Sequence, residues 1–202
     1  MNKRFTHIVV IVIAATGLLM ASCTPKMTAN LYRKNPAAFN SIHARYKRLN
    51  AEQPFSVEFK DKAFNQISLE IIKDTIRYIY KFRLDEKNLA DTLDKYKFNT
   101  AEVVLLIDEM RSVHCTWINK MDYFINRKRH SIIYMSLREK ALDSWLKAEQ
   151  YYTIAFFEEK QYFDNKGRLV AKPGDKVPMR INYALYRKIT DNICYAITEN
   201  FR

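Results

Sequence analysis

Few side chains of this chain have the types and spacing that chemistry requires. After residue 22 the histidines are His43, His114 and His130, and none has an acidic residue or another histidine at metal-ligand spacing. His114 precedes Cys115, and a thiol beside an imidazole could form a nucleophile and its base. Neighbouring side chains of a strand point to opposite faces, so in a strand this pair could not hydrogen-bond. We therefore predict no metal site and no catalytic cysteine.

Paired carboxylates could supply a general acid and base, as in the cleavage of glycans. The candidates are Glu58, Glu70, Glu158 and Glu159. The sequence gives these carboxylates no facing geometry, and Glu158 and Glu159 suit a solvated strand end or loop. We predict no catalytic residue, with a carboxylate enzyme as an open alternative.

Glycine is scarce in this chain. After residue 22 only Gly167 and Gly174 remain, and both lie in predicted turns. Loops that cradle phosphate, the dinucleotide fingerprint and the nucleophile elbow all need glycine where the backbone bends sharply or approaches a ligand. The sequence excludes these enzyme classes, and no cofactor is expected.

Aromatic and basic residues alternate in the segment 77–83, which reads RYIYKFR. Aromatic rings can stack on sugars, and guanidinium groups can bind carboxylates. In a strand, however, the rings share one face and the cations share the other, which is typical of a core face and a solvated face. Tyrosines on an exposed face could still form a partner surface.

The elements that position these residues follow from the periodicity of apolar side chains. Spacing of three and four predicts helices over 36–53, over 85–113 in two pieces with a cap at Asn99, over 141–146, and over 178–197. Alternation predicts strands over 55–59, 67–71, 76–84, 115–124, 131–137 and 151–163. The first predicted hairpin turns at Lys73 and Asp74, and the second at residues 126–129.

These elements predict an α+β fold, in which antiparallel hairpins form a sheet with helices packed on one face. Three parts are expected along the chain: a signal peptide over 1–22, a basic tether with a short amphipathic helix over 23–51, and a single α+β domain over 52–202. Within the tether, residues 24–34 are expected to be a flexible spacer.

The first residues have the layout of a secretory signal. Lys3 and Arg4 precede an apolar run over 8–20, which is too short for a comfortable bilayer span of about 20 residues. The stretch 19–23, LMASC, resembles the lipobox of bacterial lipoproteins, with Met20 where that class usually has leucine. Cleavage near Ala21 by an ordinary signal peptidase, which would leave a free cysteine, is the alternative.

The resemblance to lipoproteins implies that Cys23 receives a diacylglyceryl group and an acyl chain and becomes the mature N-terminus. In that class a non-acidic residue after the cysteine, here Thr24, implies transfer to the outer membrane. No acidic residue precedes Glu52, which favours the periplasmic face. The expected partners are therefore the membrane and, beyond it, an envelope protein or peptidoglycan.

The predicted tether is strongly basic. Removal of residues 1–22 lowers the formal charge from +12 to +10, and the segment 24–51 accounts for six positive charges with no acid. These cations could lie on an anionic membrane surface, each contributing about 1 kcal/mol. A solvated helix face is the alternative. Nucleic acid is excluded as a partner by export. The six cations are Lys26, Arg33, Lys34, Arg45, Lys47 and Arg48.

Two cysteines remain beside the lipidation site. Cys115 and Cys194 form an even pair in a compartment where disulfides form, and a bond between them would close a loop of 79 residues. Two separately buried thiols are the alternative, because the sequence does not fix the distance between them.

The sequence thus predicts a membrane-anchored periplasmic lipoprotein that is a non-enzymatic accessory or scaffold component of an envelope assembly. The alternative is a periplasmic binding domain for a small apolar or glycan ligand. A concave pocket lined by aromatic rings would favour ligand binding, whereas a filled core with an exposed apolar patch would favour docking.

Overall fold

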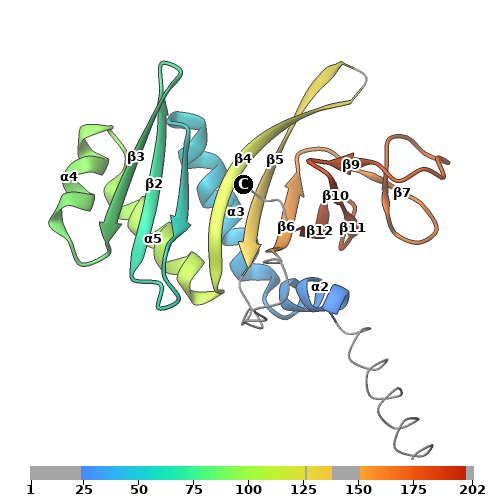
Figure 1. Ribbon diagram of the computed structural model, residues 1–202, viewed down its shortest axis with the longest axis horizontal. Helices are drawn as coiled ribbons and strands as arrows, with labels where there is room; N and C mark the ends of the chain where they lie inside the picture. The colour runs from blue at the N-terminus through green and yellow to red at the C-terminus, as the bar shows by residue number, and fades with distance from the viewer. Residues whose placement is uncertain (1–23, 126, 138–150, 199–202) are drawn as a thin grey trace, which may run out of the picture.

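The computed structural model describes residues 24–125, 127–137 and 151–198. Within these ranges the chain forms an eight-stranded sheet in the order β11-β12-β6-β5-β4-β1-β2-β3, with helices packed on one face (Figure 1). Neighbouring strands of this sheet are antiparallel. The predicted α+β class is confirmed.

The described helices lie mostly in the first half of the chain. They are α2 (Thr24–Lys34), α3 (Pro36–Glu52), α4 (Lys87–Lys95) and α5 (Thr100–Ser112). The strands of the large sheet are β1 (Phe55–Phe59), β2 (Gln66–Lys73), β3 (Ile76–Arg83), β4 (Cys115–Ile125), β5 (Lys128–Leu137), β6 (Tyr151–Phe157), β11 (Arg187–Lys188) and β12 (Ile193–Thr198). Two short ladders pair β7 (Tyr162–Phe163) with β8 (Leu169–Val170), and β9 (Arg180–Ile181) with β10 (Ala184–Leu185).

The two predicted hairpins are present, with turns that differ by a few residues from the prediction. In the first, Lys73 pairs with Ile76, so the turn is Asp74 and Thr75, both with positive φ (51° and 70°). Positive φ at both positions is what a two-residue hairpin turn requires. In the second, Ile125 pairs with Lys128, so β5 begins inside the predicted turn.

The main core lies between the helices and one face of the sheet. Alternate residues of the strands, such as Val57 and Leu69, point into this core, and Ile42 and Leu106 of the helices pack against them. All four side chains are fully buried. Asn99 caps α5 as predicted, because its side chain accepts a hydrogen bond from the backbone N–H of Glu102. The periodicity of α3 therefore identified its core face. In α5 the apolar run is wider than the buried face, because Val103, Leu106, Ile107 and Met110 are buried whereas Val104 and Leu105 are 40% and 43% exposed.

Strands β1 and β4 pair over only two residues, and a side chain of α3 bonds the backbone of β1 beside this short ladder. Their register joins Val57 with Ile118 and Glu58 with Trp117. The Tyr46 hydroxyl donates to the carbonyl oxygen of Phe55 at 2.6 Å. Burial raises the pKa of Tyr46. Tyr46 thus ties α3 to the backbone of β1.

The opposite face of the sheet is covered over its β5-β6-β12 end by the ladders of the C-terminal arm, residues 162–186. A second core forms there between Phe157 of the sheet and arm residues such as Leu169 and Tyr186. The predicted helix over 178–197 is wrong: these residues form β9, β10, β11 and β12. The reason is that β12 pairs with β6 over six residues, and Asn182 and Tyr183 form a turn with positive φ.

The predicted flexible spacer over 24–34 is also wrong, because these residues form α2. Thr28, Ala29 and Tyr32 of this helix are buried, and α2 contacts β6 and β12. The core therefore extends into residues that the sequence assigned to the tether. The predicted strand over 151–163 corresponds to β6 and β7, and the helix predicted over 141–146 lies outside the described residues.

Candidate functional site

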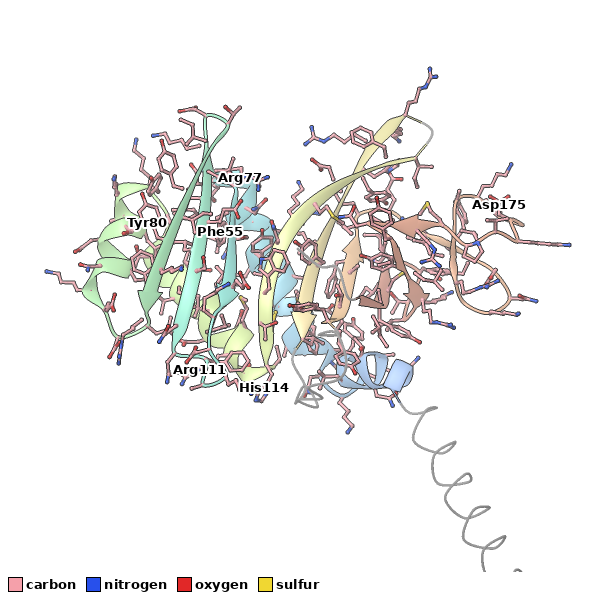
Figure 2. The ribbon with its side chains drawn as sticks, viewed as in Figure 1. Phe55, Arg77, Tyr80, Arg111, His114 and Asp175 are labelled. Carbon is pink, nitrogen blue, oxygen red and sulfur yellow. The ribbon has the colours of Figure 1, made fainter. Side chains whose placement is uncertain are left out.

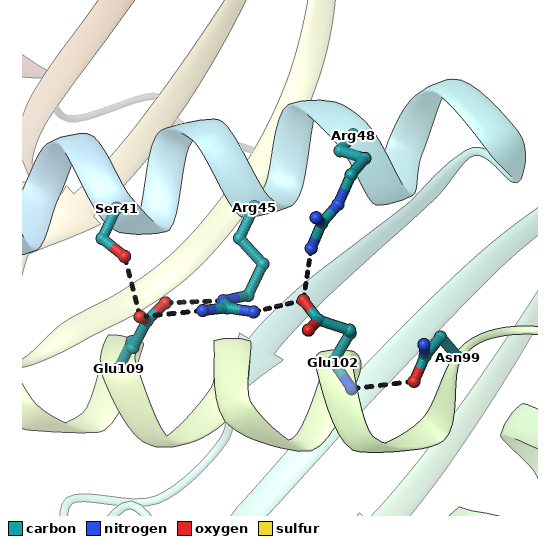
Figure 3. Close-up of polar contacts among 6 residues, drawn as sticks. All are labelled: Ser41, Arg45, Arg48, Asn99, Glu102 and Glu109. Atoms are coloured by element: carbon teal, nitrogen blue, oxygen red, sulfur yellow. Dashed lines mark hydrogen bonds and ion pairs between the residues drawn. The ribbon is translucent and has the colours of Figure 1, made fainter.

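A charge network joins α3 to α5 on the helix side of the molecule (Figure 3). Arg45 binds both Glu102 and Glu109, and its Nε lies 3.0 Å from Oε2 of Glu109. Arg48 binds Glu102, and the Ser41 hydroxyl donates to Glu109 at 2.8 Å. Hydrogen bonding to Glu109 raises the pKa of Arg45. The network crosslinks two helices that are far apart in the sequence.

This network includes two of the six cations that were predicted to lie at a membrane surface. Arg45 and Arg48 are engaged by the carboxylates of α5, so neither is a free charge on a tether. Arg33, Lys34 and Lys47 are exposed, and the side chain of Lys26 lies outside the described part of the chain. The sequence could not show that Arg45 and Arg48 form ion pairs with α5, because about fifty residues separate α3 from α5.

Substitution of Glu109 by glutamine is expected to lower the free energy of unfolding by about 1 kcal/mol, because a partly buried guanidinium loses a charged partner. The measurement is urea unfolding at low and high salt, and the loss should be smaller at high salt. Asp108→Asn removes the same charge from an exposed neighbouring position of α5 and serves as the control. Equal effects of both substitutions would show that the network contributes nothing specific.

The two cysteines do not form the disulfide that the sequence left open. Cys115 and Cys194 are both free and buried. They lie on β4 and β12, which β5 and β6 separate, so three strand spacings of about 4.8 Å place them roughly 14 Å apart. A disulfide requires Cα atoms within about 7 Å. Burial raises the pKa of Cys115 to about 12, which disfavours the thiolate form.

The histidines pack against aromatic rings and do not converge. His43 stacks on Phe156 with ring centroids 4.4 Å apart. Burial and the nearby charge of Lys47 lower the pKa of His43 to about 4. His114 meets the edge of Phe64, with ring centroids 5.5 Å apart. Among the described residues, no group of His, Cys, Asp and Glu could hold a metal ion.

Two of the four candidate carboxylates lie on one face of adjacent strands. Glu70 pairs with Ser56 and Glu58 pairs with Ser68, so the two glutamates are diagonal neighbours on β2 and β1. Each forms an ion pair, Glu58 with Lys60 at 3.0 Å and Glu70 with Arg77 at 3.5 Å. Their arrangement is typical of cross-strand charge pairing on a sheet face. Glu158 and Glu159 follow β6 and are exposed, as expected.

Three hydroxyl groups on the arm side of the sheet are buried without a hydrogen-bond partner in the described structure. Ser136 and Thr153 face each other across β5 and β6 with 1% and 0% exposure, and Tyr186 of the arm is also fully buried. Sequence analysis missed this cluster because it depends on the pairing of β5 with β6. Solvent does not reach these hydroxyls in this conformation.

Strand β3 lies at one end of the sheet and carries the aromatic and basic segment 77–83. Tyr80 hydrogen-bonds Tyr96, the residue that ends α4, with the hydroxyl oxygens 2.7 Å apart. Figure 2 shows Arg77 and Tyr80 at this end, opposite the arm. Ile76 and Ile79 are large apolar residues with exposures of 54% and 63%. The expected division into an inner ring face and a solvated cation face is present: Phe82 is buried, Tyr78 and Tyr80 are half-buried, and the three cations of the segment are exposed.

Comparison with known proteins leaves the chain without a relative: no family model, no curated protein and no solved structure matches it. In the described ranges no helix is both long enough and apolar enough to cross a bilayer.

Proposed function

We propose that this protein is a lipoprotein, anchored through Cys23 at the periplasmic face of the outer membrane, with a non-enzymatic accessory role in which its α+β domain docks an envelope partner. The observation that supports this proposal most strongly is the position of α2. The helix begins at Thr24, the residue that follows the lipobox cysteine, and it is part of the folded domain.

The contacts of α2 make the proposed anchor rigid. Tyr32 contacts Phe39 of α3 and Phe156 of β6, with ring centroids 5.9 Å and 6.3 Å apart. Its hydroxyl donates to Asn40 at 3.2 Å. A lipid on Cys23 would thus be joined to the domain through a helix rather than a flexible spacer, so the domain would stay against the membrane surface with one orientation.

The charges near α2 are compatible with an anionic surface. Arg33 and Lys34 lie exposed in its last turn, and no acidic residue lies in its first turn. Cations close to an anionic bilayer contribute about 1 kcal/mol each. They would supplement the lipid, because stable membrane binding usually requires two signals.

The alternative role, binding of a small apolar or glycan ligand, has weaker support. The unpaired hydroxyls of Ser136, Thr153 and Tyr186 would suit a polar ligand, but they are inaccessible. The exposed apolar residues Ile76 and Ile79 lie instead on a sheet edge, where docking is the more direct use.

The test compares three full-length chains expressed in a Gram-negative cell: wild type, Cys23→Ala, and a chain with ten Gly and Ser residues inserted between Cys23 and Thr24. The wild type and the insertion variant should be found in the outer-membrane fraction, and Cys23→Ala should be released. A partner retained in stoichiometric amount with the wild type should be reduced in both variants, because each loses the fixed position at the membrane. Membrane attachment of Cys23→Ala equal to that of the wild type would overturn the proposed anchor.

A further inference from the structure

The strands at the two ends of the large sheet differ in length. One end is β11, with two residues, and the other is β3, with eight. An end strand presents one row of backbone N–H and C=O groups that its own sheet does not use. Natural proteins usually keep such strands short or cover them, and β11 follows this rule whereas β3 does not.

The register of the hairpin identifies the backbone groups that point outward from β3. The residues flanking a two-residue turn, Lys73 and Ile76, form a hydrogen-bonded pair, and hydrogen-bonded and non-hydrogen-bonded pairs then alternate along an antiparallel ladder. Arg77, Ile79 and Lys81 therefore occupy non-hydrogen-bonded pairs, and their N–H and C=O groups point away from β2. These groups are available to another strand.

The side chains of this edge favour an acidic partner. Arg77, Lys81 and Arg83 are exposed and lie on the same face of β3 as Ile79. Arg77 has only a long ion pair with Glu70, at 3.5 Å, and no described residue forms an ion pair with Lys81. Opposite charges directly across a strand pair stabilise the sheet, and like charges destabilise it.

The same charges disfavour a second copy of this chain at the edge. An antiparallel pairing of β3 with β3 about Ile79 places Arg77 opposite Lys81, and a shift by one pair places Arg77 opposite Arg83. Each arrangement sets like charges face to face. A partner strand with carboxylates at alternate positions meets no such repulsion.

The position of β3 in the molecule also suits a partner. Tyr96 contacts the rings of Tyr78 and Tyr80, so α4 packs on the helix-side face of β3, and no described backbone group bonds the outward N–H and C=O groups of Arg77, Ile79 and Lys81. Figure 1 shows β3 at the end of the sheet away from α2. Five strand spacings of about 4.8 Å separate β3 from β6, so the edge lies roughly 24 Å from the strand on which α2 packs.

We propose that the outer edge of β3 binds an extended acidic segment of the partner, which adds a ninth strand to the sheet beside Arg77, Ile79 and Lys81. This inference rests on the proposed docking function and names the site and the chemistry of the partner. Backbone hydrogen bonds supply the affinity in such strand addition, and side chains at alternate positions supply the specificity.

The test uses the mature protein in detergent and a synthetic peptide, four repeats of Glu-Val with blocked ends, with hydrogen exchange followed by mass spectrometry. The peptide should slow exchange in the segment 76–84. Two control peptides separate charge from strand formation: four repeats of Lys-Val, and four repeats of Glu-Pro, which has the same charge but lacks half of the backbone donors. The Lys-Val peptide should bind at least about tenfold more weakly, as expected for the loss of two or three favourable cross-strand pairs. The Glu-Pro peptide should also bind at least about tenfold more weakly, because it lacks the N–H groups that the added strand needs.

A matched pair of variants tests the edge itself. Ile79→Pro removes an N–H that points outward and leaves the ladder with β2 intact, so binding should be lost with an unchanged melting temperature. Ile79→Val keeps that N–H and should bind as the wild type does. Lys81→Glu should reverse the preference from the Glu-Val to the Lys-Val peptide.

Equal binding of all three peptides, protection outside β3, or full binding by Ile79→Pro would overturn the inference. A concentration-dependent dimer whose segment 76–84 is protected without peptide would show that a second copy occupies the edge instead. These results do not depend on a membrane, so failure of the edge proposal is distinguishable from failure of the proposed anchor.

Discussion

Replacement of Tyr46 by alanine is expected to lower the free energy of unfolding by about 4 kcal/mol, the cost of removing a large aromatic ring from a filled core. Tyr46 is fully buried, and its ring lies 5.1 Å from that of Phe55, centroid to centroid. The variant also loses the hydroxyl that donates to the Phe55 carbonyl of β1. Urea unfolding followed by circular dichroism measures the change.

The more conservative Tyr46→Phe separates the ring from its hydroxyl. Asn50 still donates to the Phe55 carbonyl at 3.0 Å, so this variant should lose only about 1 kcal/mol. If Tyr46→Phe were as damaging as Tyr46→Ala, the ring would contribute little. If both were neutral, the contacts of Tyr46 with β1 would not stabilise the fold.

Acidification from pH 6.5 to pH 4 is expected to cost about 1–2 kcal/mol of stability through His43 alone, after a discount for its partial exposure. Burial against Phe156 and the charge of Lys47 lower the pKa of His43 from 6.5 to about 4, and Glu158 acts in the opposite direction. In this pH range the unfolded chain binds a proton that the folded chain does not, so stability falls as the pH falls. Below pH 4 both states are protonated, and the loss from this residue is complete.

The measurement compares the unfolding free energies of the wild type and His43→Phe at several pH values. Carboxylates titrate in the same pH range, but they contribute equally to both proteins, so the comparison removes their effect. The difference in unfolding free energy between the two proteins should change by about 1–2 kcal/mol between pH 6.5 and pH 4. Lys47→Met should raise the pKa of His43, so the pH range over which His43 lowers the stability should become narrower. A difference that is constant with pH would contradict the neutral, stacked state of His43.

The helices and strands whose apolar residues recur at only one spacing were predicted well from the sequence. Helix α3 and the hairpin of β2 and β3 match their predicted positions closely because their apolar residues recur at only one spacing. The predicted C-terminal helix failed for a definable reason: its apolar residues Ile181, Leu185, Ile189, Ile193 and Ile197 are four residues apart, and that spacing also places them on one face of a strand. The β-branched side chains and the partner strand β6 decided the outcome.

Features that depend on tertiary contact could not be predicted. The helix α2 is polar and begins with Thr24 and Pro25, and its helical state depends on packing against β6 and β12. The ion pairs of Arg45 with Glu102 and Glu109 form only because α3 lies beside α5. The segment 77–83 was identified as a possible partner surface, but its position at the end of the sheet follows from strand order, which the sequence does not contain.

The central claim, that Cys23 anchors this domain to a membrane, is tested most directly by the intact mass of the protein extracted from membranes of the expressing cell. We predict a chain that begins at Cys23 and carries the mass of a diacylglyceryl group and an acyl chain, both absent from Cys23→Ala. An unmodified Cys23, whether the signal is cleaved or retained, would contradict the claim and leave the domain without its proposed position at the membrane.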